Sequence, residues 1–522
     1  MQRFRRLIAP PAAAAATAAV AAALVGSLAV AQVAPKPVTA AAAATPAVLQ
    51  NSYVNLPDMG SGANAMISRA DEFQIGRMMM KNLRDEGQVI EDPEATEYMQ
   101  SLGSRIGAQA QEGTQRFTFF VVKDRGVNAF AIPGGFIGTI YGLILQSATV
   151  SELAGVLAHE IGHVVQRHIA RAVQAQSRMS LPMMAAMLGA ILVGVAGGGD
   201  GAIGLMAMAQ GTAMRQQINF TRMEETEADH VGIGFLYAAD FDANGVASFW
   251  SKYIQIQGPE EQYYSIPDVL KSHPVTSLRI AEARSRAAQF PPRPLRKDTP
   301  GYALIRERLR VITAGPEEDL RPYYAKVMAN GGDGLALQYG CALAALKAGD
   351  AAGAAKTLHR LVDANPGITI LHSALGEAQM TAGDQEGALK TFAHAISLYP
   401  RNVPLTVRYA ETLLKAGQAK RAHELLLDLF NNDTPTPEQI RLTALAASSA
   451  GDTGDAYYYM AEYHLSSGDL MLATQQLDLA LTEPRLTEVQ RKRFLARREE
   501  IRDFLREQRG QRVQSGGAGG GR

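Results

Sequence analysis

Apolar residues in the first half of the chain follow helical spacing in some stretches and extended spacing in others. Helical periodicity predicts helices over residues 68–83, 94–109 and 153–169. Residues 117–122 combine β-branched and aromatic side chains, which predicts a strand. Residues 128–137 predict a second extended stretch that contains a Pro-Gly-Gly turn and continues into another strand. The first half is therefore expected to be α+β, mainly helical with a small β-sheet.

The second half of the chain repeats one pattern. Glycine and proline recur there at intervals of 34 residues, as Gly349, Gly383, Gly417 and Gly451, and as Pro366 and Pro400. This period, with glycine between paired helices and proline closing the unit, indicates tetratricopeptide repeats. Such repeats stack into an α-solenoid whose concave surface binds peptides or partner proteins. We expect this domain over residues 316–508, followed by a disordered glycine-rich tail over 509–522.

The first residues of the chain predict export. Three arginines among the first six residues precede a long Ala/Val/Leu-rich run, and residues 29–31 form an Ala-Val-Ala cleavage signal. We therefore expect residues 1–31 to be a signal peptide cleaved near Ala31. An uncleaved membrane anchor is the alternative, because the run is long enough to span a bilayer. Residues 32–62 are rich in proline and alanine and are expected to form a flexible linker.

Charge balance and cysteine content exclude some classes of protein. The 522 residues include 51 basic and 51 acidic side chains, and this neutral balance argues against nucleic acid as a partner. Cys341 is the only cysteine, which excludes an internal disulfide framework and a cysteine-rich metal site.

Candidate chemistry lies in the helical run over 153–169, which contains His159-Glu160-x-x-His163. Residues four apart lie on one face of a helix, so the two imidazoles can reach one metal ion. Zinc suits two imidazoles and a carboxylate with one open position, and Glu160 is then placed to act as general base. The motif also arises by chance, but a Thr149-x-x-Glu152 capping box at the helix start supports the functional interpretation.

A second pair of candidate residues lies in the predicted helix near residues 219–237. Glu225 and Asp229 are four apart and share one helix face, whereas Glu227 points elsewhere. In such a pair, one carboxylate can bind the metal while the other orients a ligand histidine.

These motifs together resemble a known group of proteases. The histidine motif followed by Glu225-x-x-x-Asp229 is similar to the gluzincin arrangement. With the extended segment at 128–135, it resembles the family of the CAAX prenyl protease and the heat-shock protease HtpX over residues 65–290. The resemblance implies a zincin-type protease domain, which we place at 63–315, with one zinc ion per chain. It further implies Glu225 as third zinc ligand beside His159 and His163, and Asp229 as the partner of the His159 imidazole.

The same resemblance places Asn128, Ala129 and Phe130 beside the substrate cleft. A strand at a protease cleft can pair with an extended peptide substrate by edge addition. An ordinary hairpin in a small sheet is the alternative.

Three further histidines require an interpretation. His273 begins a His-Pro-x-Thr-x-x-Arg element, and in relatives this histidine approaches the zinc. It could stabilise the developing oxyanion or fill the open coordination site in a latent state, and the alternative is a loop histidine that caps the next helix. His168 and His230 lack such support and are expected to be surface or packing residues.

Residues 181–209 form two apolar halves separated by a glycine-rich break. Each half is shorter than the ~20 residues that a membrane span needs. The segment is expected to be buried core, a mobile lid, or a flap in peripheral contact with a membrane.

The pairing of a protease half with repeats resembles the periplasmic β-barrel assembly-enhancing proteases. This resemblance implies a periplasmic enzyme, misfolded or misassembled outer-membrane proteins as substrates, and the barrel assembly machinery as a partner docked through the repeats. The alternative is a chaperone or scaffold of outer-membrane protein assembly with a latent metal site.

Overall fold

The computed structural model describes residues 68–110, 116–175, 222–256, 273, 275–294 and 299–517. Contacts divide the chain into two units, Met1–Gln50 and Asn51–Arg522, and every described residue belongs to the second. The predicted signal peptide (1–31), linker (32–62) and apolar segment (181–209) lie outside the described residues. Within the described part of the chain, no helix combines the length and apolar character that crossing a bilayer requires.

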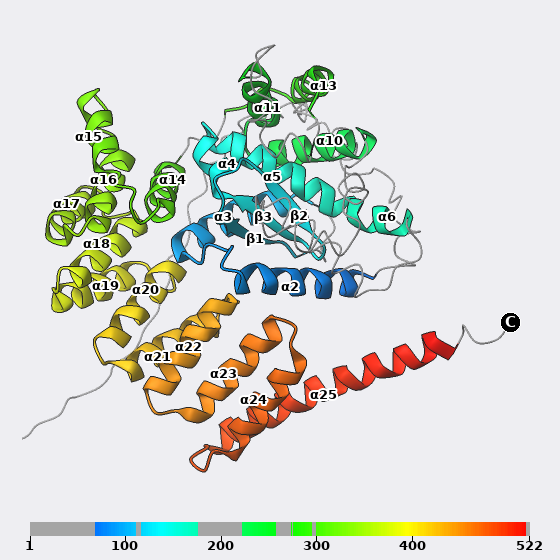
Figure 1. The fold of residues 1–522 in the computed structure, drawn as a ribbon, viewed down its shortest axis with the longest axis vertical. Helices are drawn as coiled ribbons and strands as arrows, with labels where there is room; N and C mark the ends of the chain where they lie inside the picture. The colour runs from blue at the N-terminus through cyan, green and yellow to red at the C-terminus, as the bar shows by residue number, and fades with distance from the viewer. Residues whose placement is uncertain are drawn as a thin grey trace, which may run out of the picture. The chain divides into compact units, whose positions relative to one another are not determined.

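Three short strands form the sheet of the first half (Figure 1). β1 (Thr118–Val122) runs parallel to β3 (Phe136–Ile140), and β2 (Ala129–Ile132) pairs antiparallel with the other side of β3. The turn between β2 and β3 contains Gly134 and Gly135 at φ angles of 84° and 85°, which glycine adopts without strain. The predicted strand and hairpin are confirmed, and β2 lies at one edge of the sheet.

The predicted helices before the sheet are also confirmed. α2 (Arg69–Asp85) begins after Ser68, and α3 (Pro93–Gly107) begins after Asp92. Each of these two side chains accepts a hydrogen bond from a backbone N–H of the first helical turn, as an N-cap does.

α5 (Val150–Val165) follows the short α4 (Tyr141–Gln146) and packs against β2, β3 and α3. It is buried from Glu152 to His163, as expected for a helix that is apolar on nearly all sides. Its predicted capping box forms only in part. Thr149 Oγ1 accepts a hydrogen bond from the Glu152 N–H. The Glu152 carboxylate, however, accepts a hydrogen bond from the Ala148 N–H and not from the Thr149 N–H that a capping box requires.

The prediction of one continuous helix through His168 is wrong. α5 ends at Val165, and α6 (His168–Ala175) begins after Arg167, whose φ angle is 52°. Arg167 is 6% exposed, and its Nη2 lies 3.2 Å from Oε2 of Glu72 on α2. This buried ion pair accompanies a left-handed conformation that a non-glycine residue rarely adopts.

The rest of the first half is helical. α10 (Arg222–Ala238) lies beside α5, while α11 (Gly245–Ile256) packs against both α5 and α13 (Ser277–Ala287). α14 (Pro300–Thr313) contacts α3 and α4 on one side and α16 of the repeats on the other.

The repeats form consecutive helix pairs, as predicted. Their helices are α15 (Arg321–Ala329), α16 (Leu335–Lys347), α17 (Ala351–Ala364), α18 (Thr369–Thr381), α19 (Gln385–Leu398), α20 (Val403–Lys415), α21 (Ala419–Phe430), α22 (Pro437–Ser449), α23 (Thr453–Ser466), α24 (Leu470–Thr482) and α25 (Glu488–Gly517). The four glycines spaced by 34 residues all have positive φ angles, between 73° and 93°, at the turns within the pairs.

α25 corrects the predicted tail. The helix continues to Gly517, so residues 509–517 are helical, and only 518–522 lie outside the described residues. Ion pairs one turn apart, such as Arg502–Glu499 and Arg506–Asp503, support a helix whose sequence is strongly polar.

The buried residues Asp92, Glu94 and Arg308 and the partly buried Arg408 connect the first half to the repeats, and we call these four the charged junction. Arg308 Nη2 lies 2.7 Å from Asp92 Oδ2 and 3.1 Å from Glu94 Oε2, and Arg408 Nη2 lies 2.9 Å from each carboxylate. Burial raises the pKa of Asp92, but Arg308 and Arg408 outweigh it and hold that pKa at about 2.

Candidate metal centre

Two glycines allow the two helices of the site to approach closely. A Cβ atom at Gly162 of α5 would lie 2.8 Å from the Ala228 carbonyl oxygen, and one at Gly232 of α10 would lie 2.8 Å from that of Ala158. Larger residues at these positions would push α5 and α10 apart. The close approach brings Glu225 of α10 over the histidines of α5.

The three predicted ligands converge. His159 Nε2 lies 3.0 Å from His163 Nε2 and 3.5 Å from Glu225 Oε2, and His163 Nε2 lies 3.6 Å from Glu225 Oε1. All three side chains are at most 2% exposed. Tetrahedral zinc with bonds of about 2.0–2.1 Å separates its ligand atoms by about 3.3 Å. The donor atoms of this structure therefore fit zinc in type and spacing.

Asp229 lies where the resemblance implies. Its Oδ1 is 2.8 Å from His159 Nδ1, so the imidazole donates to the carboxylate and its Nε2 lone pair faces the centre. Burial raises the pKa of Asp229, but Arg279 and His159 outweigh it and hold that pKa far below its ordinary value.

Arg279 is a site residue that sequence reasoning missed. It donates two hydrogen bonds to Asp229, and its Nη1 lies 2.6 Å from Glu225 Oε2. The signal was present, because Arg279 is the last residue of the motif that begins at His273. Burial raises the pKa of Glu225, but His273, His159 and Arg279 bring it to about 2, so this carboxylate is ionised.

His273 joins the centre from outside the two helices. Its Nδ1 lies 2.9 Å from Glu225 Oε1 and 3.3 Å from His159 Nε2, and its Nε2 lies 3.6 Å from Glu160 Oε1. His273 therefore offers a fourth donor atom beside the three predicted ligands. The alternative role as a helix cap is excluded, since the Thr276 hydroxyl caps α13.

Glu160 is fully enclosed next to the donor atoms. The side chain is 1% exposed, and its Oε1 has no hydrogen-bond partner among the described residues. A buried carboxylate oxygen of this kind is costly unless a proton, water or ligand meets it. Glu160 is thus placed to accept a proton beside the predicted metal position.

His230 is exposed and His168 is buried, so both positions are compatible with the prediction of surface or packing residues. His168 is fully buried, and its Nδ1 lies 2.7 Å from Nδ1 of the predicted ligand His163. Burial lowers the pKa of His168 to about 4. Sequence reasoning missed this contact because it depends on the break between α5 and α6 at Arg167, which leaves no periodic signal.

Ala129 and Phe130 begin β2, Asn128 directly precedes it, and α5 packs against this strand. Their side chains are at most 8% exposed, and Phe130 stacks edge-on against Phe120 in the core. Contact with a peptide would therefore involve the backbone of β2 and not these side chains.

The site has two histidines on one helix and a glutamate on a second helix, with a further glutamate placed beside them as a base. This arrangement defines a metallopeptidase of the gluzincin type. Residues 93–287 match Peptidase family M48, and residues 379–446 match the Tetratricopeptide repeat. The β-barrel assembly-enhancing protease of Escherichia coli is 30% identical over 92% of this chain and 96% of its own. A Vibrio cholerae relative in the same group is 37% identical over 76% of this chain and 81% of its own. The mitochondrial metalloendopeptidase OMA1 of Schizosaccharomyces pombe is 28% identical over 35% of this chain and 51% of its own.

The chain belongs to peptidase family M48. It is a metalloendopeptidase with a candidate zinc site and a domain of tetratricopeptide repeats.

Proposed function

We propose that this metallopeptidase is a zinc-dependent endopeptidase of the cell envelope that hydrolyses misfolded or misassembled outer-membrane proteins. The observation that carries the proposal is the convergence of His159, His163 and Glu225 within zinc-ligand spacing beside the enclosed Glu160. These three residues would hold one zinc ion per chain.

Glu160 would act as the general base. When bound, zinc polarises the scissile carbonyl and lowers the pKa of the attacking water. Glu160 takes the proton of this water and later transfers it to the leaving amine. Asp229 and Arg279 keep the His159 ring and the Glu225 carboxylate in place, so the donor atoms do not need to reorganise.

His273 would close the centre in a latent state. Its Nδ1 is as near to Glu225 and His159 as those ligands are to each other, which suits a fourth ligand. A peptide carbonyl or water needs this same corner, so His273 must withdraw before cleavage.

The substrate would bind as an extended strand. β2 is an edge strand that packs against α5, and an edge strand offers unpaired backbone groups to a peptide. Recognition through the backbone suits a protease that removes unfolded proteins, because it depends little on the substrate sequence.

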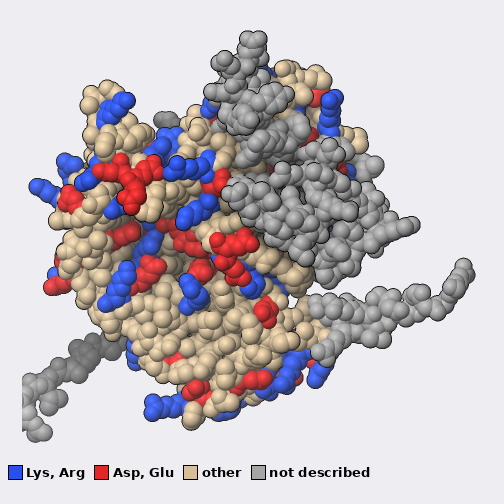
Figure 2. Space-filling view, in the orientation of Figure 1, with Lys and Arg blue, Asp and Glu red and all other residues tan. Residues whose placement is uncertain are grey.

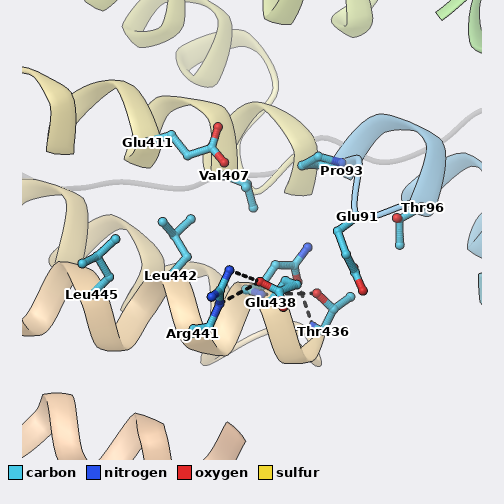
Figure 3. Close-up of a pocket in the computed structure, with 11 residues that line it drawn as sticks. Glu91, Pro93, Thr96, Val407, Glu411, Thr436, Glu438, Arg441, Leu442 and Leu445 are labelled. Atoms are coloured by element: carbon cyan, nitrogen blue, oxygen red, sulfur yellow. Dashed lines mark hydrogen bonds and ion pairs between the residues drawn. The ribbon is translucent and has the colours of Figure 1, made fainter. Parts of the chain in front are cut away.

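The repeats would dock partner proteins, including the barrel assembly machinery. A pocket of about 490 Å³ lies between the start of α3 and the repeat helices α20 and α22 (Figure 3). Val407, Leu442 and Leu445 give it an apolar wall, while Glu91 and Glu411 add negative charge. Basic and acidic side chains intermingle on the face shown in Figure 2, which suits protein partners better than nucleic acid.

The envelope location rests on the relatives, whose name refers to β-barrel assembly, and on the predicted signal peptide. We propose a signal peptide over 1–31, a linker over 32–62, the protease domain over 63–315 and the repeat domain over 316–508. A chaperone with a latent metal site is the second candidate, favoured by the position of His273.

The decisive experiment measures bound zinc and casein cleavage for the wild type and the Glu160→Gln variant. We expect about one zinc per chain in both proteins, and loss of cleavage by at least ~100-fold in the variant. Full cleavage by the variant would exclude Glu160 as the base. A zinc-free wild type would remove the proposed centre, and the chaperone function would then stand.

A further inference from the structure

His168 lies outside the zinc-binding motif but contacts one of its histidines. Its Nδ1 is 2.7 Å from His163 Nδ1, and its Nε2 is 3.2 Å from Glu227 Oε2. Glu227 also accepts a hydrogen bond of 2.8 Å from Arg171 Nη2. A continuous chain of polar contacts therefore leads from Glu227 through His168 to His163.

Two features of the chain build this arrangement. The left-handed turn at Arg167 ends α5 and places His168 beside the ring that lies one turn earlier. α10 carries three acidic residues at alternate positions, of which Glu225 and Asp229 face the centre while Glu227 faces α6. The residue that the sequence pattern set aside as pointing elsewhere thus points at His168.

The negative charge of Glu227 fixes the direction of the hydrogen bonds from Glu227 through His168 to His163. The Glu227 carboxylate can only accept, so His168 donates through Nε2–H. A neutral imidazole has one ring proton, so His168 Nδ1 carries a lone pair and accepts from His163 Nδ1–H. The Nε2 of His163 is then left with its lone pair directed at the centre, where His159 Nε2 lies 3.0 Å away.

We propose that His168 is a positioning residue that relays the charge of Glu227 to the His163 ring. Asp229 contacts the His159 ring directly. α10 therefore orients both imidazoles, that of His159 through Asp229 and that of His163 through Glu227 and the intervening His168. Hydrogen-bonded partners of this kind fix the tautomer and the ring orientation of metal ligands. The inference rests on the proposed role of His163 as a zinc ligand.

A matched pair of variants tests the relay in the full-length protein. Asn has an oxygen near the place of the histidine Nδ1 and can accept from His163, whereas Leu has a similar branched shape without an acceptor. We expect His168→Leu to weaken zinc affinity by about 10- to 100-fold, measured by chelator competition. His168→Asn should retain most of the affinity, and His230→Leu, which removes an exposed histidine, should retain all of it.

The absorption spectrum of the Co²⁺-substituted protein gives a second measurement. It should change in His168→Leu and remain close to the wild type in His168→Asn. Equal losses in the Leu and Asn variants would assign His168 to packing and overturn the relay, as would a Leu variant with wild-type affinity.

A further variant covers the case in which His168→Leu does not fold. Glu227→Gln should weaken zinc binding by up to about tenfold, while Glu224→Gln leaves it unchanged. Wild-type affinity in the Glu227 variant would overturn the relay. A wild type without zinc would instead overturn the proposed function, so the two failures are distinguishable.

Discussion

Two buried groups of charged side chains in this protein are balanced in different ways. In the charged junction, the two carboxylates face two guanidinium groups, Arg308 and Arg408, at 2.7–3.1 Å. In the metal centre, the carboxylates of Glu225 and Asp229 share one guanidinium, Arg279, and the imidazole lone pairs of His159 and His163 face each other. The junction is complete by itself, whereas the centre still requires a cation. In this protein, buried charged side chains therefore indicate a functional site only where the protein's own cations do not balance the buried carboxylates.

The largest effect should come from removing the cation that the centre requires. We expect a zinc chelator to abolish casein cleavage, because the donor atoms then hold nothing that can activate water. The helical content measured by circular dichroism should change little, since the junction and the repeats use no metal. Added zinc should restore cleavage. Global unfolding on chelation would show that the centre is structural as well.

The next experiment removes an ion pair from the charged junction and measures the stability of the protein. Arg308→Met leaves Asp92 and Glu94 buried with one guanidinium fewer, and we expect a loss of about 3–5 kcal/mol in the free energy of unfolding in urea. Arg498→Met removes a half-exposed pair with Asp478 and should cost at most about 1 kcal/mol. Equal losses in both variants would contradict the distinction, and zinc content should stay at the wild-type value in each.

The difference between these groups also explains what the sequence could predict. The centre was foreseeable because His159 and His163 occupy one helix face, and Glu225 and Asp229 another. Arg308 and Arg408 lie far apart in the sequence and meet α3 only through tertiary packing, so no local pattern marks them. The repeats were foreseeable from period alone, since each helix pair uses the same turn.

Errors in the sequence analysis arose where tertiary contacts outweigh local preference. The apolar run over 153–169 is periodic enough for one helix, but the ion pair of Arg167 with Glu72 accompanies a helix break that no propensity predicts. For the same reason, the contact between His168 and His163 could not be expected. The glycine-rich composition of residues 509–522 suggested a disordered tail, although α25 continues to Gly517.

A smaller effect should appear when the stability that the charged junction supplies is measured as a function of pH. The pKa of Asp92 is lowered from 3.8 to about 2, so the stability that its ion pairs supply is complete above about pH 4 and is lost as the pH falls through about 2. We expect Asp92→Asn, which keeps an N-cap, to be less stable than the wild type by about 2 kcal/mol at pH 6. This difference should vanish near pH 2. A constant difference across the range would show that the carboxylate charge is not what stabilises the junction.

The smallest effect tests whether His273 blocks the centre. His273 comes from a segment separate from α5 and α10, and its Nδ1 lies 2.9 Å from Glu225 Oε1 and 3.3 Å from His159 Nε2. If it closes a latent site, His273→Ala should raise casein cleavage severalfold while His159, His163 and Glu225 still bind zinc. Progress curves for equal amounts of zinc-loaded wild type and variant measure this change. A variant that binds zinc but does not cleave would instead assign His273 to stabilisation of the oxyanion, because removing such a donor costs about 100- to 1000-fold in rate.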